Sequence, residues 1–273
     1  MPALSLLTAT WRLRVCRAVL ALMSAWLWSS LAHAVPTGLL NDTGITFCGD
    51  ATTNTADCGV VATDGGSFPR QDARYGWDAQ AAAGQLAKTG GGGAGFDFTK
   101  ITNNGTVLPA NSTAALGTGP MDWACTRDNV TNLIWEVKTT SGLRSQSHTY
   151  SWYNSVDTNN NGGNPGTQSG GTCFATGRCD TEKFVQDVKA AGLCGASDWR
   201  MPTVKELEGI ADLGRVNPTI DPTYFPNTPP SSYFWSGSPY AHSSNSAWWV
   251  YLGFANAFVR SNGYSVRLVR AGQ

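Results

Sequence analysis

Six cysteines follow residue 34 of the 273-residue chain, and they restrict its fold more than any other feature. Their number is even, and cysteines in exported chains commonly form disulfide frameworks. Six cysteines allow many pairings. Their spacing favours two local bridges around short polar loops and one long-range bridge. The expected pairs are Cys48–Cys58, Cys173–Cys179 and Cys125–Cys194. A zinc site is the alternative, but the sequence has no C-x-x-C motif and no Cys/His cluster.

The first 34 residues are typical of an export signal. Arg12, Arg14 and Arg17 precede an apolar run, and residues 32–34 match an A-x-A cleavage site. The apolar run is shorter than the ~20 residues that a membrane span needs. Cys16 lies ahead of the run, which is the wrong place for lipid attachment. We therefore expect a signal peptide at 1–34 and a secreted, periplasmic or cell-surface protein with no membrane span.

The charge balance and the motifs argue against several partners. Removal of the signal takes three of the 19 basic residues and none of the 19 acidic ones, which leaves 16 against 19 and a net charge near −3. Such a chain is not expected to bind nucleic acid. We also expect no cofactor and no metal. Residues 157–162 match the first half of a calcium loop, but Gln168 replaces the bidentate Glu and Pro165 interrupts the motif.

The residue pattern after the signal predicts an α+β fold in two regions. Residues 35–119 are rich in Gly, Thr and Asn, and we expect short strands and loops there. Residues 120–273 are richer in Trp and Cys and form the main domain. Strands are expected at 96–101, 132–138, 247–254 and 264–270.

Two helices are expected in the main domain. The first begins at Asp180 or Thr181, either of which can cap a helix. The second follows Thr203 and Glu206, which have the spacing of a capping box, and Gly214 is expected to end it.

The tail of the chain has the composition of a recognition surface. Residues 222–259 contain no Asp, Glu, Lys or Arg but many aromatics, together with Ser and Asn. Aromatic side chains give contact area at low entropy cost, and Ser and Asn give adaptable hydrogen bonds. The alternation at 247–254 places Trp248, Val250, Leu252 and Phe254 in the core. The expected ligand-binding residues on the opposite face and beyond are Trp249, Tyr251, Asn256, Phe258, Asn262 and Tyr264.

The chain offers little catalytic chemistry. Of its three histidines, His33 lies in the signal, and His148 and His242 lie in Ser-rich loops. A Ser-His-Asp triad needs a histidine held by a carboxylate, and no acid lies near His242 in sequence. We therefore expect no enzyme.

Six blocks of the second half resemble a known bacterial family. They are CTRDNVTNLIWEVK, CDTEKFVQDVKAAGLCGASDWRMPTVKELEGIADLG, IDPTYFPN, FWSGSPYA, AWWV and VRLVR. In this order, over residues 121–270, they resemble the Lcl C-terminal domain family. The resemblance implies a C-type-lectin-like or formylglycine-generating-enzyme-like fold. It also implies export and binding, which for the namesake is adhesion to sulfated glycosaminoglycans. This chain lacks the collagen-like G-x-y repeat of that adhesin.

The residues at 239–264 are also similar to the variable cassettes of proteins diversified by retroelements on this fold. The expected function is therefore an exported adhesin or receptor-like module that binds a glycan or protein ligand, with a diversified surface as a further hypothesis. An enzyme of the formylglycine-generating type and a structural envelope protein without a ligand are the alternatives.

Overall fold

The computed structural model describes residues 39–156, 162–251 and 253–272. The expected signal peptide lies outside these residues, as do most of the calcium-like loop and Leu252. Among the residues that are described, no helix has both the length and the apolar character needed to cross a membrane.

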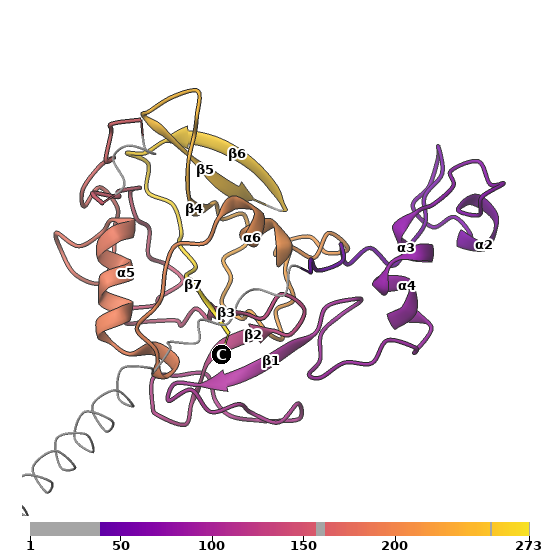
Figure 1. Ribbon diagram of the computed structural model, residues 1–273, viewed down its shortest axis with the longest axis horizontal. Helices are drawn as coiled ribbons and strands as arrows, with labels where there is room; N and C mark the ends of the chain where they lie inside the picture. Colours follow the sequence, from indigo (N-terminus) through magenta and orange to yellow (C-terminus); the bar gives the residue numbers. More distant parts are fainter. Residues whose placement is uncertain (1–38, 157–161, 252, 273) are drawn as a thin grey trace, which may run out of the picture. The chain divides into compact units, whose positions relative to one another are not determined.

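A four-stranded antiparallel sheet contains the first strands of the chain and the last one (Figure 1). Its strands, in spatial order, are β1 (Phe98–Thr102), β2 (Trp123–Asp128), β3 (Leu133–Glu136) and β7 (Val269–Ala271). The strands expected at 96–101 and 132–138 are confirmed. In the turn between β2 and β3, the Asp128 carboxylate accepts a hydrogen bond from Val130 N (3.0 Å), a common way for Asp to stabilise a turn.

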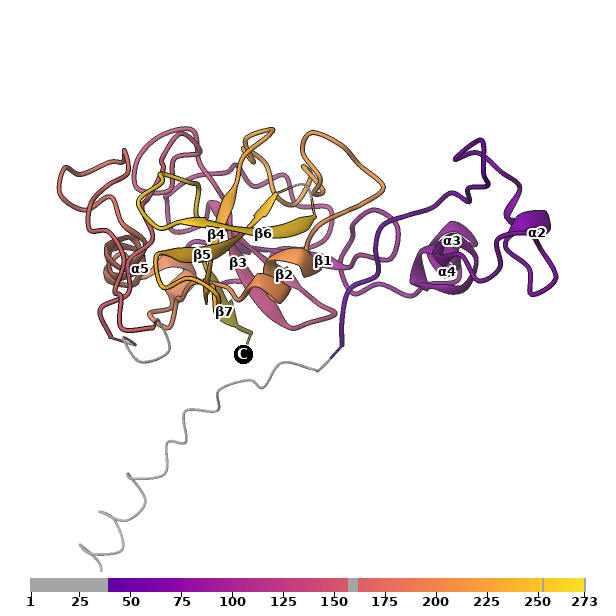
Figure 2. The same cartoon turned by 90° about the horizontal axis from the view of Figure 1, so that it is seen from above.

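A three-stranded antiparallel sheet is formed by the aromatic tail (Figure 2). Its strands, in spatial order, are β4 (Phe234–Pro239), β5 (Ser246–Tyr251) and β6 (Phe254–Val259). Gly253 lies in the turn between β5 and β6 with a φ of 83°, a conformation that favours glycine. The tail is therefore a hairpin at this point, and the single strand expected at 247–254 is wrong. β6 lies at the edge of the sheet.

Two helices of the main domain begin where capping residues predict them. The Asp180 side chain accepts a hydrogen bond from Lys183 N (2.9 Å) at the start of α5 (Thr181–Ala190). The expected capping box of Thr203 and Glu206 is present at the start of α6 (Val204–Gly209). This helix ends at Gly209, before the expected Gly214. Beyond it, Asp212 N and Leu213 N bond to the carbonyls of Thr219 (3.3 Å) and Thr43 (2.8 Å) in other segments.

The N-terminal region contains three short helices where only strands and loops were expected. They are α2 (Cys58–Val61), α3 (Asp72–Tyr75) and α4 (Trp77–Ala82). Local capping explains the first, because the Asp57 side chain accepts a hydrogen bond from Gly59 N (2.7 Å). The small cluster of Cys48, Val61 and Ala62 is buried beside it.

Two apolar clusters form the core. The first contains large buried side chains from α5, from β4 and β5, and from the loops before and after α5: Tyr150, Trp152, Phe184, Trp199, Trp235 and Trp249. The second contains side chains from the four-stranded sheet, from α6, from the loop between α6 and β4, and from β5: Phe98, Trp135, Leu207, Phe225 and Val250. Because β5 contributes to both clusters, both faces of that strand are covered along part of its length.

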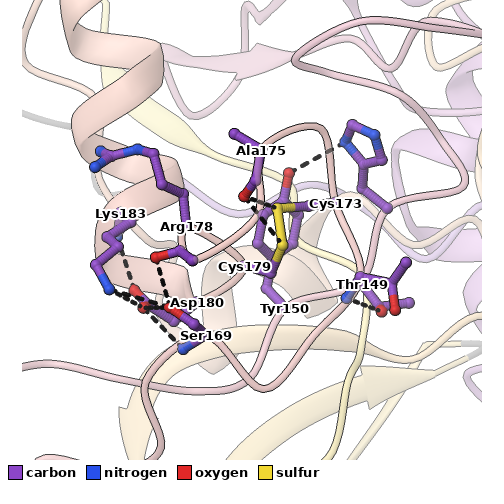
Figure 3. The surroundings of a disulfide bond; sticks show 12 residues. Thr149, Tyr150, Ser169, Cys173, Ala175, Arg178, Cys179, Asp180 and Lys183 are labelled. Carbon is purple, nitrogen blue, oxygen red and sulfur yellow. Dashed lines mark hydrogen bonds and ion pairs between the residues drawn. A yellow bond between two sulfur atoms is a disulfide. The ribbon is translucent and has the colours of Figure 1, made fainter.

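The described residues contain three disulfides, which join the same pairs as those expected from the spacing. Cys125–Cys194 links β2 to the short 3-10 helix η1 (Leu193–Gly195) across 69 residues. Cys173–Cys179 closes a loop directly before α5. Figure 3 shows this bridge beside Asp180, which also pairs with the ammonium of Lys183 (3.1 Å).

Candidate ligand-binding surface

The pairing of β5 with β6 brings four of the six predicted ligand-binding residues to one face of the sheet. Trp249 lies opposite Asn256, Tyr251 lies opposite Phe254, and Phe258 lies opposite Ala247. Directly opposed residues of antiparallel strands point to the same side. The tail sequence therefore folds so that Trp249, Tyr251, Asn256 and Phe258 share a side with Phe254.

Two tyrosines from neighbouring segments complete this face. The ring centroid of Tyr233 lies 4.6 Å from that of Trp249, 4.8 Å from that of Tyr251 and 5.0 Å from that of Tyr264. Tyr264 also lies 6.4 Å from Phe258. We call this set the aromatic surface: Tyr233, Tyr251, Phe254, Phe258 and Tyr264, with Asn256 and Asn262.

The aromatic surface is accessible to a partner. Phe254 and Phe258 are 52% and 48% exposed, and Tyr233 is 38% exposed. Tyr251 and Tyr264 are half-buried, and Asn256 is exposed. Exposed aromatics in a contiguous patch mark interaction sites on soluble proteins. Phe254, Asn256 and Phe258 all lie on β6, the edge strand.

The expectation that Trp249 faces solvent is wrong. Its side chain is only 7% exposed and belongs to the first core cluster, together with its neighbour Trp235 on β4. Tyr233 and Tyr264 cover it. The indole N–H of Trp249 is buried and has no hydrogen-bond partner among the described residues. Trp249 therefore forms the floor of the aromatic surface rather than its exposed part.

The expected core positions on the other face are correct only in part. Val250 is buried in the second cluster, as expected. Trp248 is half-buried and stacks edge-on against Tyr240 (5.2 Å between centroids). Phe254, expected in the core, is exposed, because the turn at Gly253 reverses the chain and breaks the alternation.

The main chain holds the aromatic surface in place. Tyr150 and Tyr264 exchange two backbone hydrogen bonds, of 2.8 and 3.1 Å. Asn262 Nδ2 donates to the Tyr264 hydroxyl (3.0 Å), and the side-chain oxygen Oδ1 of Asn256 accepts from Ala257 N (2.7 Å). The surface is thus a preformed set of rings and amides, and its strands carry no charged side chain.

Tyr233 and Phe254 were missed by the sequence prediction. Tyr233 lies in the same charge-free tail, but no periodicity connects it with β5. Phe254 was placed on the opposite face because the turn was not anticipated. The glycine at position 253 was the available signal, since an isolated glycine in a strand pattern often marks a bend.

Two histidines and a cluster of three carboxylates are other polar groups with potential binding chemistry. His148 Nδ1 lies 3.3 Å from both the carbonyl of Leu143 and the Tyr150 hydroxyl, and His242 stacks on Tyr240. Ligand atoms of three carboxylates, Asp42, Asp72 and Asp78, lie within 4.8 Å of one another, an arrangement able to hold a cation. Burial raises the pKa of Asp78 to about 6, and the charges of Asp42 and Asp72 add to this rise.

A hollow of about 390 Å³, lined mainly by apolar atoms, lies elsewhere on the main domain, between α5 and the residues around Arg200. Tyr153, Gln186, Lys189 and Arg200 are among the residues that line it. The Arg200 guanidinium donates two hydrogen bonds to the Glu206 carboxylate, of 2.8 and 2.6 Å. This pairing connects Arg200 to the capping box of α6.

These features define a class of protein: a disulfide-linked α+β domain with an aromatic surface on a three-stranded sheet. A comparison with protein-family models matches the Lcl C-terminal domain to residues 124–270, more than half of the chain. The chain belongs to the Lcl C-terminal domain family, as the six sequence blocks predicted. Searches of the curated proteins and of the solved structures found no match.

Proposed function

We propose that the protein is an exported binding module that holds a glycan or protein ligand on the aromatic surface. The observation that carries the proposal is a set of exposed rings, Tyr233, Phe254 and Phe258, that are linked to one another through Tyr251 and Tyr264. Such rings can stack on sugars or anchor a protein side chain. The amides of Asn256 and Asn262 and the tyrosine hydroxyls supply donors and acceptors at the edges of the rings.

Preorganisation supports binding at this place. The rings of Tyr251 and Phe254 are fixed by a paired hairpin, and Tyr264 is fixed by its backbone bonds to Tyr150. Groups that are already ordered lose less entropy when a ligand binds. The absence of charge from residues 222–259 favours a neutral ligand face over a strongly acidic or basic one.

The proposal also includes a fold assignment that is more specific than α+β. We assign the main domain to the C-type-lectin-like or formylglycine-generating-enzyme-like class, in which binding surfaces are built on the C-terminal strands. Family membership supports this assignment. The pairing of β7 with β3, which joins the C-terminal end of the chain to the first strands, is compatible with it.

A binding role is preferred to a catalytic one. All six cysteines of the described residues are in disulfides, whereas a formylglycine-generating enzyme needs a reactive cysteine pair. A ligand-free envelope protein would have no use for exposed rings at an edge strand. Diversification is a further part of the proposal, because the aromatic surface consists of Asn, Tyr and Phe. An adjacent reverse transcriptase gene and a template repeat in the DNA would be its signature.

The ligand can be sought with the mature protein on paired arrays of glycans and of bacterial surface proteins. We expect reproducible binding to members of one array only, with the glycan array identifying a sugar ligand and the protein array a protein ligand. Binding to neither array would contradict the proposal in favour of a structural role.

A further inference from the structure

A second, smaller cavity lies on the opposite side of the three-stranded sheet from the aromatic surface. It has a volume of about 60 Å³. Its walls come from α6, from the loop at 218–232 and from β4 and β5. Exposed Ser231 and half-buried Pro218 lie at its rim, whereas Leu207, Ile210 and Val250 are buried deeper.

One fully buried cation is part of the cavity wall. Arg267 is 1% exposed. Its guanidinium donates to the carbonyl of Glu136 (2.8 Å) and to the hydroxyl of Thr228 (2.7 Å), and both acceptors are neutral. Among the described residues, no carboxylate lies within ion-pair distance of Arg267. Burial lowers the pKa of Arg267 to about 10, where it is still protonated at neutral pH.

The surroundings of Arg267 have an excess of positive charge. Lys138, Arg144 and Arg267 are all at least nine-tenths buried around one buried carboxylate, Glu136. The ammonium of Lys138 lies 2.8 Å from that carboxylate, which also accepts from Leu268 N. Arg144 donates to main-chain carbonyls. Burying unpaired charge is costly, so an anion beside Arg267 would stabilise this group.

Two carboxylates are adjacent in sequence to residues of the cavity wall, and both already have partners of their own. Asp212, next to Ala211, pairs with Arg215 (2.6 Å). Asp221, next to Ile220, accepts from Gly93 N (3.1 Å) and Thr223 N (2.9 Å). In the described part of the chain, no acidic residue lines the cavity. Its polar lining apart from Arg267 consists of hydroxyl groups, those of Thr219, Thr228, Ser231 and Ser232.

We propose that this cavity binds a short-chain aliphatic monocarboxylate, whose carboxylate pairs with Arg267 and whose chain contacts Leu207, Ile210 and Val250. Arginine is suited to a carboxylate because its N–H groups match the two oxygens. The apolar walls favour a hydrocarbon chain over a polyanion. One water needs about 10–15 Å³ in the same measure, so the space suits an acid of about four to six non-hydrogen atoms.

Thermal unfolding of the full chain with sodium butyrate tests the proposal. We expect a saturable rise in Tm of about 3–6 °C at roughly tenfold excess over Kd. Butyramide, which has the same shape but no charge, should give less than about a third of that rise. Sodium chloride at the same ionic strength should give none. A shift that is equal for butyramide, or no shift with butyrate, would overturn the proposal.

Two further measurements locate the site. Ala211→Leu, which fills the cavity, should abolish the butyrate shift, whereas Phe258→Ala, which alters the aromatic surface, should keep it. In the unsubstituted protein, NMR should show contacts from the butyrate methyl group to Ile210 and Val250 even if Ala211→Leu fails to fold. A shift that survives Ala211→Leu, or butyrate contacts only elsewhere, would sink the idea. Neither outcome bears on the aromatic surface.

Discussion

At the scale of single residues, two neighbouring tryptophans differ in how deeply they are buried. Trp249 lies in the first core cluster beneath Tyr233 and Tyr264, whereas Trp248 is half-buried. We predict that Trp249→Ala lowers the free energy of unfolding by about 3–5 kcal/mol, the usual result of truncating a large buried side chain.

Denaturant unfolding checks this prediction, with Phe258→Ala as the control. Phe258 is 48% exposed, so its removal should change stability by less than about 1 kcal/mol. Equal losses for the two variants would show that Trp249 is not a core residue.

Asp78 is the residue through which we expect the free energy of unfolding to depend most clearly on pH. Its side chain is fully buried, and burial, with smaller contributions from Asp42 and Asp72, raises its pKa from 3.8 to about 6. The folded protein therefore binds this proton more tightly than the unfolded chain does. The stabilisation is fully present below about pH 4 and is lost as the pH rises through about 6.

We expect the Asp78→Asn substitution to remove this pH-dependent contribution to the free energy of unfolding. Because other carboxylates contribute in the opposite direction, for example Glu206 with its lowered pKa, the informative quantity is the difference between the two proteins. The free energy of unfolding of the wild type, relative to Asp78→Asn, should fall between pH 4 and pH 7. A difference that is constant with pH would contradict the raised pKa.

At the scale of elements, we expect each disulfide to stabilise the fold by an amount that grows with the length of the loop that it closes. Cys125–Cys194 spans 69 residues and Cys173–Cys179 spans 6. In the chain-entropy account, the longer bridge stabilises by about 4 kcal/mol and the shorter by about 2 kcal/mol. We predict a larger fall in Tm for the Cys125→Ala/Cys194→Ala variant than for the Cys173→Ala/Cys179→Ala variant, as measured by calorimetry. The reverse order would show that native-state contacts, rather than loop length, dominate.

The sequence predicted where helices and disulfides occur better than it predicted which face of a strand is buried. Caps at Asp180 and Thr203 and the cysteine spacing are local signals, and the structure agrees with them. The burial of Trp249 is not a local property. Alternation shows that a strand has two faces, but it does not show which face the rest of the chain covers, and β5 is partly covered on both.

The residues predicted to bind a ligand nevertheless lie close together, largely as expected. Tyr251, Asn256, Phe258 and Tyr264 lie on one surface because the β5–β6 register preserves their common side. The turn at Gly253 added Phe254 to them. An apolar run without a polar break conceals such a turn, so periodicity alone extended the strand through it.

At the scale of the whole molecule, the disulfides define an oxidised protein, and we propose that it is exported. We predict that the mature chain begins near Val35 and that its six cysteines resist alkylation unless the protein is reduced. Mass spectrometry of protein recovered from the cell envelope or medium measures both properties. Six alkylated cysteines in the native, unreduced protein would contradict the disulfide framework.

The central claim is that the aromatic surface is where the protein binds its ligand. The most direct measurement compares the array binding of the wild type with that of a Phe254→Ala/Phe258→Ala variant and of Lys189→Ala, which lies in the other hollow. The account predicts at least a tenfold loss of affinity for the first variant, with an unchanged circular dichroism spectrum, and wild-type binding for the second. Retained binding by the double variant, with loss in Lys189→Ala, would place the binding site elsewhere and contradict the account.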